Sequence, residues 1–463
     1  MKRVDSSFRD PNGFIFEDKG IIYRQINLEY KMDYDKLMEP NGLYDELVSN
    51  KMLVAHQESS DDLMEKNANS LYKIIKPDII PYISYPYEWT LQQYRDAATL
   101  TLDICLMAIK HGMILKDASS YNIQFVGGRP IFIDTLSFTK YEEGQIWEGY
   151  GQFCRHFLAP IVLMAEKSVE LSQLMRVYID GIPLDLASKL LPKKTKLNLP
   201  LYLHLHLHGK KQKDHKVSEK RHENSFLPKT SLVAIVESLK SLVNRKAKKH
   251  EATEWGDYYE KMLNYSDKAF SSKYNIVEKY LLQTGAKTIC DLGANKGEFS
   301  KIAGNISGTY VVAYDIDHTA VEKHFYTLKE NNVANILPLV LDLTNPSPAL
   351  GWANKERLSL QERSNWDCIM ALALIHHLSI SNNLPFAHIA SYFADLTRYL
   401  IIEFVPKEDS QVQKLLLNRK DIFTKYTQET FEEEFSKYYT IIGKENVLES
   451  ARTMYLMEKK KDT

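Results

Sequence analysis

Residues 288–300 read Thr288-Ile-Cys-Asp-Leu-Gly-Ala-Asn-Lys-Gly-Glu-Phe-Ser300. A short apolar and β-branched run ends at Asp291, Gly293 and Gly297 follow, and a helical pattern then begins. Glycines at a strand-to-helix turn let backbone N–H groups approach a ligand closely, and the N-terminus of the helix adds its dipole. The stretch therefore predicts a ligand-binding turn at the start of an α/β domain.

Strand and helix patterns alternate on the C-terminal side of this turn. We expect helices to begin at residue 297 and to cover 318–331, and strands to cover 287–291, 310–315, 336–342, 367–373 and 399–405. Several of these strands are nearly continuous Val, Ile and Leu, as expected when helices cover both faces of a parallel sheet. The alternation predicts a doubly wound, Rossmann-like sheet that binds its ligand at the carboxyl ends of the strands.

Four acidic residues fall at the ends of the expected strands, namely Asp291, Asp315, Asp342 and Glu403. With the segment 366–378, this ordered set resembles the motifs of class I S-adenosylmethionine-dependent methyltransferases, from about residue 254 to the C-terminus. The resemblance implies a methyltransferase that uses S-adenosylmethionine, and we expect no metal. A nicotinamide dehydrogenase is disfavoured, because Asn295 stands where the dinucleotide fingerprint has its second glycine.

The resemblance also implies roles for individual residues. Asp315 would accept hydrogen bonds from both ribose hydroxyls, Asp342 and the backbone N–H of Leu343 would contact the adenine edge, and Ile316 would pack on the adenine face. The full set of expected cofactor-binding residues is Asp291, Gly293, Asn295, Gly297, Asp315, Ile316, Asp342, Leu343 and Ala371. The alternative for each Asp is an ordinary turn or helix-capping residue.

The fourth strand leads into His376 and His377, where methyltransferases of this class border the transferred methyl group. A histidine there would remove a proton from the acceptor, since its unperturbed pKa of about 6.5 suits that task. Glu403 would line the acceptor cavity; the alternatives are packing, capping and solvated roles. The Asn-Pro-Pro-aromatic motif of nucleic-acid amino-methylating enzymes is absent. We therefore expect a small-molecule acceptor, with a nucleic acid as the less favoured partner.

The N-terminal half carries a different set of residues. Asp117, Asn122 and Asp134 follow a helix expected over residues 90–111, and a hairpin around Gly127-Gly128 separates the last two. Their spacing resembles the catalytic and metal-binding loops of kinase-like phosphotransferases. No glycine-rich loop or Val-Ala-Ile-Lys strand accompanies them, and Arg24 is the nearest strand cation. An α+β, kinase-like but degenerate domain is expected; turn-forming roles for the three residues are the alternative.

Lysine and arginine crowd the chain between about residues 191 and 252. We expect an N-terminal domain over 1–190, a basic linker over 191–250 and the methyltransferase domain over 251–463. An RNA or protein acceptor that binds the linker is an alternative. His204, His206 and His208 alternate with leucine and would share one face of a strand, but structural roles are favoured over a metal site.

The composition is that of a globular protein, with 44% hydrophobic and 26% charged residues and a formal net charge of -1. This balance argues against a dedicated nucleic-acid binder. The four cysteines Cys105, Cys154, Cys290 and Cys368 form no CxxC pair and are expected to be reduced core residues. No signal peptide or membrane-length apolar run is visible, so a cytoplasmic enzyme without membrane insertion is expected.

Overall fold

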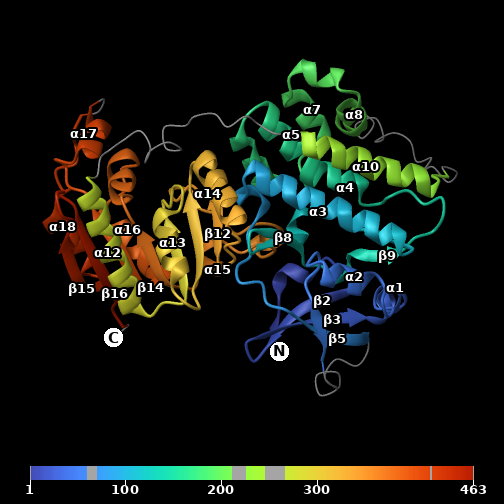
Figure 1. Ribbon diagram of the computed structural model, residues 1–463, viewed down its shortest axis with the longest axis horizontal. Helices are drawn as coiled ribbons and strands as arrows, with labels where there is room; N and C mark the ends of the chain where they lie inside the picture. Colours follow the sequence, from blue (N-terminus) through green and yellow to red (C-terminus); the bar gives the residue numbers. More distant parts are fainter. Residues whose placement is uncertain (1, 60–69, 211–225, 246–265, 418–419, 462–463) are drawn as a thin grey trace. The chain divides into compact units, whose positions relative to one another are not determined.

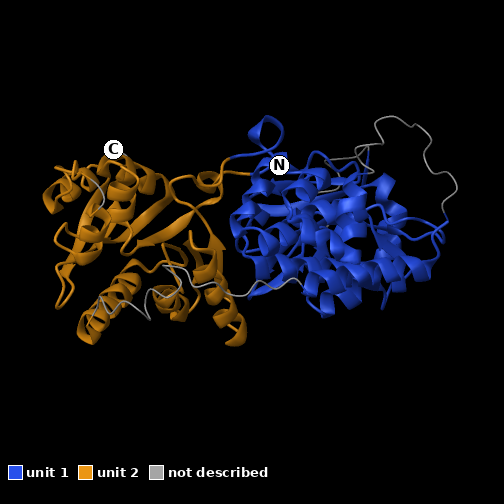
Figure 2. Ribbon diagram, turned by 90° about the horizontal axis from the view of Figure 1, so that it is seen from above, with its two compact units in different colours: residues 1–249, 349–357 blue, residues 250–348, 358–463 orange. Residues whose placement is uncertain are grey.

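The computed structural model describes residues 2–59, 70–210, 226–245, 266–417 and 420–461 (Figure 1). The chain forms two compact units, coloured separately in Figure 2. Unit 1 comprises residues 1–249 together with Ala349–Arg357, and unit 2 comprises His250–Pro348 and Leu358–Thr463. The segment Ala349–Arg357 therefore lies within the C-terminal half of the sequence but belongs to the N-terminal unit.

Unit 2 is built on a sheet of seven strands in the order β12-β11-β10-β13-β14-β16-β15. The first five are mutually parallel, while β16 is antiparallel to both of its neighbours. The strands are β10 (Thr288–Leu292), β11 (Tyr310–Asp315), β12 (Ile336–Val340), β13 (Trp366–Ala371), β14 (Thr397–Phe404), β15 (Tyr439–Asn446) and β16 (Thr453–Lys459). The order reverses between β10 and β13, which is the switch point where doubly wound sheets bind ligands. The Rossmann-like sheet expected from the sequence is confirmed.

Helices cover both faces of this sheet. They are α12 (Asp267–Thr284), α13 (Glu298–Asn305), α14 (His318–Glu330), α15 (Leu360–Arg363), α16 (Phe386–Leu396), α17 (Ser410–Leu416) and α18 (Gln428–Phe435). On one face, α12 and α13 bury Val277 and Ile302 against Ile289 and Ile401 of the strands. On the other face, Phe386 of α16 and Phe431 of α18 pack against Phe404 in edge-on and tilted ring contacts. Alternate residues of β14 therefore serve opposite cores.

Unit 1 begins with a five-stranded antiparallel sheet in the order β1-β2-β3-β5-β4. Its strands are β1 (Lys2–Arg3), β2 (Gly13–Asp18), β3 (Ile21–Asn27), β4 (His56–Glu58) and β5 (Leu71–Pro77), and the helices α1 (Lys31–Leu37) and α2 (Leu43–Ser49) lie between β3 and β4 in the sequence. Tyr30 and Tyr34 pack with Ile26 and Ile75 in a core beside the sheet. The expected α+β character of the N-terminal half is confirmed.

The rest of unit 1 is mainly helical around α3 (Leu91–Lys110). Thr90 caps this helix by accepting from the N–H of Gln93, whose side chain accepts in return from the N–H of Thr90. Two short antiparallel pairs follow, β6 (Met113–Leu115) with β9 (Phe138–Lys140) and β7 (Ile123–Val126) with β8 (Arg129–Phe132). Among the described residues, the other α-helices of unit 1 are α4 (Tyr150–Phe153), α5 (Ala159–Glu166), α6 (Leu174–Val177), α7 (Leu184–Leu190), α8 (Leu199–Leu201) and α10 (Lys229–Arg245).

In its described residues, the stretch expected as a basic linker contains a packed helix. Helix α10 packs against α3 and buries Leu232, Val236 and Leu239 completely. Lys240 of α10 forms an ion pair with Asp103 of α3, so this part of the basic stretch is an amphipathic helix that packs against its neighbour. The lysines between residues 211 and 249 that are not part of α10 lie outside the described residues.

The three alternating histidines lie on a helical turn and not on a strand. His204 contacts the hydroxyls of Tyr150 and Ser238, and His206 contacts Ser188 and Thr195. Within the described ranges, no group of three His, Cys, Asp or Glu side chains is arranged to hold a metal ion. The favoured structural reading of these histidines agrees with their contacts.

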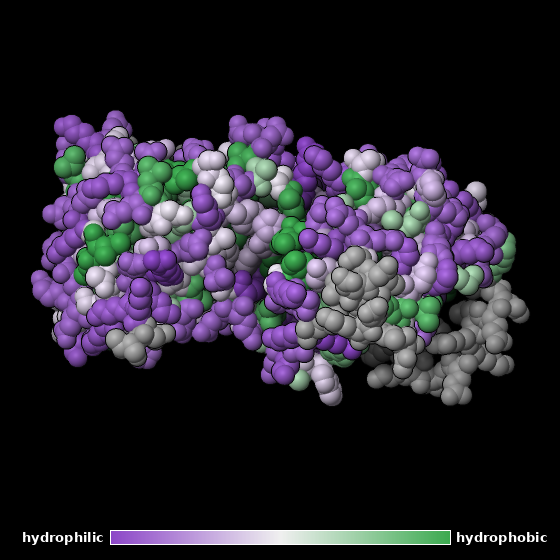
Figure 3. All heavy atoms as spheres, turned by 90° about the horizontal axis from the view of Figure 1, so that it is seen from below, coloured by the Kyte–Doolittle hydropathy of each residue, from purple (hydrophilic) through white to green (hydrophobic). Residues whose placement is uncertain are grey.

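All four cysteines are buried and free, as expected. Burial raises the pKa of the Cys105 and Cys154 thiols to about 12, so both stay protonated near neutral pH. Among the described helices, none combines the length and the apolar character needed to cross a bilayer. The face shown in Figure 3 is mainly hydrophilic, with separate apolar patches.

Candidate functional site

A cavity of about 260 Å³ opens in unit 2 at the carboxyl ends of four neighbouring parallel strands. Its lining comes from the segments that follow β10, β11, β12 and β13, with Leu292, Asp315, Leu341 and Leu372 at or next to the strand ends. Apolar side chains predominate, and Asp315 and Asp342 are the carboxylates in the lining. A mostly apolar hollow with a few placed polar groups is typical of a small-molecule site.

Asp315 is held in a fixed orientation by backbone groups at the cavity. One carboxylate oxygen accepts from the N–H of Asn295 at 2.8 Å, and the other accepts from the N–H of Asp317 at 2.9 Å. A carboxylate offers about four acceptor positions, so two remain for a ligand. Burial raises the pKa of Asp315 to about 6, although hydrogen bonds from backbone groups oppose this shift.

The loop after β10 reaches the cavity through Gly293 and Asn295, both in left-handed conformations, with φ of 79° and 51°. Gly297 also has positive φ, at 80°, but faces the protein interior: a Cβ there would lie 2.0 Å from the His324 ring. Asp291 is likewise outside the lining and accepts from the Ser300 hydroxyl at 2.6 Å. Asp291 and Gly297 therefore support the conformation of the loop from the protein interior and do not face the cavity.

The adenine-side candidates all line the cavity. Ile316 is 60% exposed beside Asp315, and Asp342 and Leu343 follow β12. One oxygen of Asp342 accepts from both the N–H and the hydroxyl of Thr344, at 2.9 and 2.6 Å. Asp342 thus also makes the turn contact that the alternative interpretation predicts.

The two histidines after β13 have different positions. His377 lines the cavity, whereas His376 is 1% exposed and lies outside the lining, with its ring centroid 4.2 Å from that of His377. Burial and the positive charge of Arg452 lower the pKa of His377 to about 4. His377 is therefore a neutral imidazole at physiological pH, and a weaker base than an exposed histidine.

Glu403 and Ala371 were expected at the site, and the structure places both outside the cavity lining. Glu403 is fully buried on the α12 face of β14 and bonds to Lys273 at 2.7 Å. The strand runs one residue beyond Glu403, so its side chain follows the alternation of the sheet and does not reach the rim. Ala371 is buried as the last residue of β13, and the next two residues, Leu372 and Ala373, line the cavity in its place.

Sequence reasoning did not identify several lining residues, notably Ala373, Leu374, Ser381 and Asn382. Ala373 has a φ of 51°, which no sequence pattern predicts for alanine. Ser381 and Asn382 end a π-helical turn over His377–Ser381. The only available signal was their position shortly after a strand end.

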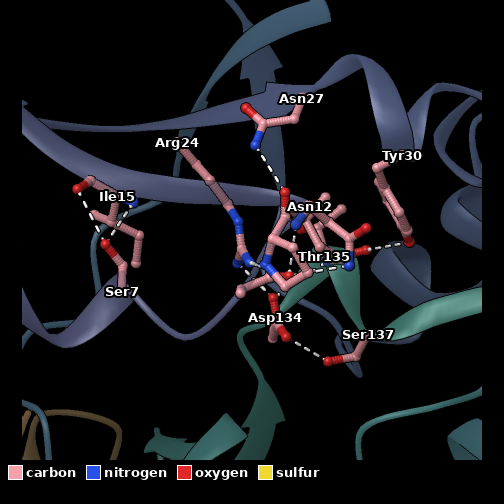
Figure 4. Close-up of polar contacts among 12 residues, drawn as sticks. Ser7, Asn12, Ile15, Arg24, Asn27, Tyr30, Asp134, Thr135 and Ser137 are labelled. Carbon is pink, nitrogen blue, oxygen red and sulfur yellow. Dashed lines mark hydrogen bonds and ion pairs between the residues drawn. The ribbon is translucent and has the colours of Figure 1, made fainter. Parts of the chain in front are cut away.

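Unit 1 holds a second polar cluster, centred on Asp134 and shown in Figure 4. Arg24 of β3 forms an ion pair with Asp134 and also bonds to Asp10 at 3.0 Å. Ser137 donates to Asp134, and the Asn122 amide lies 3.4 Å from the Ser137 hydroxyl. Burial alone would raise the pKa of Asp134, but Arg24 and Ser137 hold it below its usual value.

Asp117 completes this cluster. Its carboxylate accepts from the N–H of Ser119 at 2.9 Å, and burial and the charge of Asp134 raise its pKa. The fold thus brings Asp117, Asn122 and Asp134 together, with Arg24 of β3 paired to Asp134. The β1–β2 connection holds Asp10, the residue that Arg24 also binds.

Comparison with known proteins identifies the family. Over 462 residues the chain is 32% identical to nodulation protein NoeA of Rhizobium meliloti (strain 1021). The alignment covers 99% of this chain and 96% of that protein. The chain therefore belongs to the NoeA family of nodulation proteins. No protein-family model matches the sequence.

Several solved structures resemble part of the chain. Protein PH0226 of Pyrococcus horikoshii OT3 matches at 16% identity and a TM-score of 0.33, covering 44% of this chain and 99% of that one. Magnesium protoporphyrin IX methyltransferase of Synechocystis PCC 6803, solved with bound SAH, matches at 17% identity and a TM-score of 0.30, covering 42% and 84%. WbdD matches at 17% identity and a TM-score of 0.29, covering 48% and 46%. At these TM-scores the likenesses do not bear on the activity of this chain.

Proposed function

We propose that unit 2 is a methyltransferase that takes its methyl group from S-adenosylmethionine. The observation that carries the proposal is the oriented carboxylate of Asp315, which ends the strand next to β10 and faces a cavity at the switch point of the sheet. Its two unused acceptor positions suit the two adjacent hydroxyls of a ribose. The ribose would lie over the loop that contains Gly293 and Asn295.

The rest of the cofactor would follow the lining in both directions. The adenine would lie between Ile316 and the Asp342–Leu343 segment, because that side of the cavity offers an apolar face beside an acceptor and a backbone donor. The amino-acid end would lie near Gly293 and Ala373. The sulfonium loses its positive charge as the methyl group leaves, so the protein mainly has to align the acceptor.

The acceptor would enter beside His377, Ser381 and Asn382, the polar residues on the β13 side of the cavity. A neutral His377 removes the proton of an oxygen, carbon or nitrogen acceptor as the methyl group transfers. A small molecule is the favoured acceptor, because the cavity has a volume of only about 260 Å³ and a mostly apolar lining. An RNA or protein acceptor that uses the basic stretch is the alternative.

Labelled methyl donor provides the test. The protein is incubated with methyl-labelled S-adenosylmethionine and separated small-molecule, RNA and protein fractions of a cell extract. Label in the small-molecule fraction that disappears with Asp315→Ala supports the proposal. Label in RNA or protein favours the alternative acceptor, and the absence of transfer to every fraction contradicts methyltransferase activity.

A second candidate function, phosphotransfer in unit 1, is favoured by the cluster of Asp117, Asn122 and Asp134. In kinase-like enzymes the corresponding residues take the hydroxyl proton and hold magnesium. Here the Asp134 carboxylate is already engaged by Arg24 and Ser137. Nucleotide binding would therefore require Arg24 to turn toward the phosphates.

Nucleotide titration separates an active from a degenerate cluster. Magnesium-dependent ATP binding that is lost with Asp134→Ala, and retained with Asp35→Ala on the exposed surface of α1, would support phosphotransfer. Equal ATP affinity with and without magnesium, or no binding, would leave the cluster a structural one.

A further inference from the structure

Three buried charged side chains and the partly buried Asp409 form a network beneath the cavity of unit 2. Glu403 is 0% exposed, and Lys273 and Arg452 are each 2% exposed. Lys273 bonds to Glu403 at 2.7 Å, and Arg452 lies 3.6 Å from the other Glu403 oxygen. Arg452 also bonds to Asp409 at 2.7 Å. Two cations and two carboxylates thus neutralise one another.

A buried ion network is not explained by stability alone. Removing two charges from water costs several kcal/mol per ion, and a well-packed apolar pair is often as stable. Such groups are retained in some proteins because they fix one particular arrangement.

Glu403 has a third partner, the backbone N–H of Ala373. The oxygen that accepts from Lys273 also accepts from the backbone N–H of Ala373 at 2.7 Å. Ala373 lines the cavity and has a φ of 51°, a left-handed conformation that is unfavourable for a residue with a side chain. A charge-assisted bond to its N–H offsets that cost.

Ala373 begins the turn that carries His377. The N–H of His377 bonds to the carbonyl of Leu374 at 3.0 Å, so the position of the histidine follows from the turn after β13. Helix α17, which Asp409 caps, also contacts the π-helical turn His377–Ser381. The network therefore supports this turn from two elements.

We propose that Glu403 is a positioning residue: through the N–H of Ala373 it fixes the turn that forms the β13 side of the cavity and places His377 there. This deepens the proposed function, on which the role of His377 rests. Glu403 itself does not touch the cavity, and its two cationic partners make it unsuited to act as a base.

Two substitutions within the same ion pair separate positioning from stability. Glu403→Leu removes the acceptor of the Ala373 N–H, whereas Lys273→Met breaks the pair but leaves that bond intact. Glu403→Gln keeps an oxygen that can accept from Ala373 and serves as the conservative rescue. Where Glu403→Leu alone does not fold, the double variant with Lys273→Met removes both charges together.

Hydrogen exchange measured by mass spectrometry on the ligand-free protein is the first readout. We expect amides of residues 373–378 to exchange at least tenfold faster in Glu403→Leu, and within threefold of wild type in Lys273→Met and Glu403→Gln. Equal exchange rates in all variants would overturn the proposal. So would a loss of amide protection that follows the drop in melting temperature in Glu403→Leu and Lys273→Met alike. This readout does not depend on the cofactor.

Calorimetric titration with S-adenosylhomocysteine is the second readout. We expect Glu403→Leu to weaken binding about tenfold and Lys273→Met less than threefold. Unchanged affinity in Glu403→Leu would contradict positioning of the cavity wall even when Asp315→Ala abolishes binding. If wild type itself does not bind, the proposed function fails, and the exchange result alone decides whether Glu403 fixes the turn.

Discussion

The carboxylate of Asp315 accepts from the backbone N–H of Asn295 at 2.8 Å, joining the end of β11 to the loop after β10. The second oxygen is held by Asp317 in the same way. Asn295 is in the left-handed region, so the loop turns its N–H toward the neighbouring strand end. The two strand ends thus prepare one carboxylate for a ligand before any ligand is present.

The state of Asp315 predicts how binding depends on pH. Its raised pKa of about 6 means that the ligand-free carboxyl holds its proton more tightly in the folded protein than in the unfolded chain. Protonated Asp315 therefore stabilises the fold fully below the unfolded pKa of about 3.9, and this contribution is lost as pH rises through 6. Ribose hydroxyls bind the ionised form better. Calorimetric affinity for S-adenosylhomocysteine should therefore fall up to about tenfold per unit as pH drops below 6.

The control for this pH profile is Asp315→Asn, which cannot titrate. Its weaker affinity should be nearly level between pH 5 and 7. A wild-type affinity that does not change over the same range would show that the carboxylate makes no such contact.

His377 is expected to act on the acceptor and not on the cofactor. Its pKa of about 4 keeps it neutral, so a loss of activity from its protonation should appear only well below pH 6. Substitution His377→Gln should lower turnover roughly 10²-fold, the lower end of the usual contribution of a general base, because a pKa of about 4 makes His377 a weak base. The affinity for S-adenosylhomocysteine should change less than threefold.

His388, which is exposed on α16, offers a matched substitution to glutamine with no expected effect on turnover. The readout is transfer of labelled methyl to the acceptor identified in the extract. Wild-type turnover in His377→Gln would remove the base role and favour an acceptor that carries no proton to lose.

Gly297 should tolerate no side chain. Alanine there would meet the buried His324 ring at 2.0 Å in a left-handed backbone. Gly285 has a similar φ of 61° but open space around it. We expect Gly285→Ala to cost roughly 1–2 kcal/mol from backbone strain, and Gly297→Ala an additional 1–3 kcal/mol or so from overpacking. Urea unfolding of both variants measures the difference, and equal losses would contradict the contact.

Much of unit 2 was predictable because its strands have a clear sequence pattern. The continuous apolar runs around Val311 and Ile369 fit only a sheet covered on both faces, and the strand ends then follow. Residues at the rim, such as Asp315 and Asp342, were therefore identified together. Glu403 was expected beside them, but β14 continues for one residue beyond it and its side chain lies in the core.

Other features depend on tertiary contacts that leave no pattern in the sequence. The left-handed Ala373 is supported by Glu403, which lies 30 residues away in the sequence. The basic composition around α10 suggested a linker, although its leucines bury against α3. In both cases packing, and not local propensity, determines the structure.

The most direct test of the cofactor site is calorimetric titration of S-adenosylhomocysteine into wild type, Asp315→Ala and Asp367→Ala. Asp367 accepts from two backbone N–H groups at 2.8 and 2.9 Å, as Asp315 does, but near the amino end of β13. Binding in wild type and Asp367→Ala, with at least a hundredfold loss in Asp315→Ala, is the predicted result. Equal affinity in all three proteins, or no binding by wild type at millimolar ligand, would contradict the account.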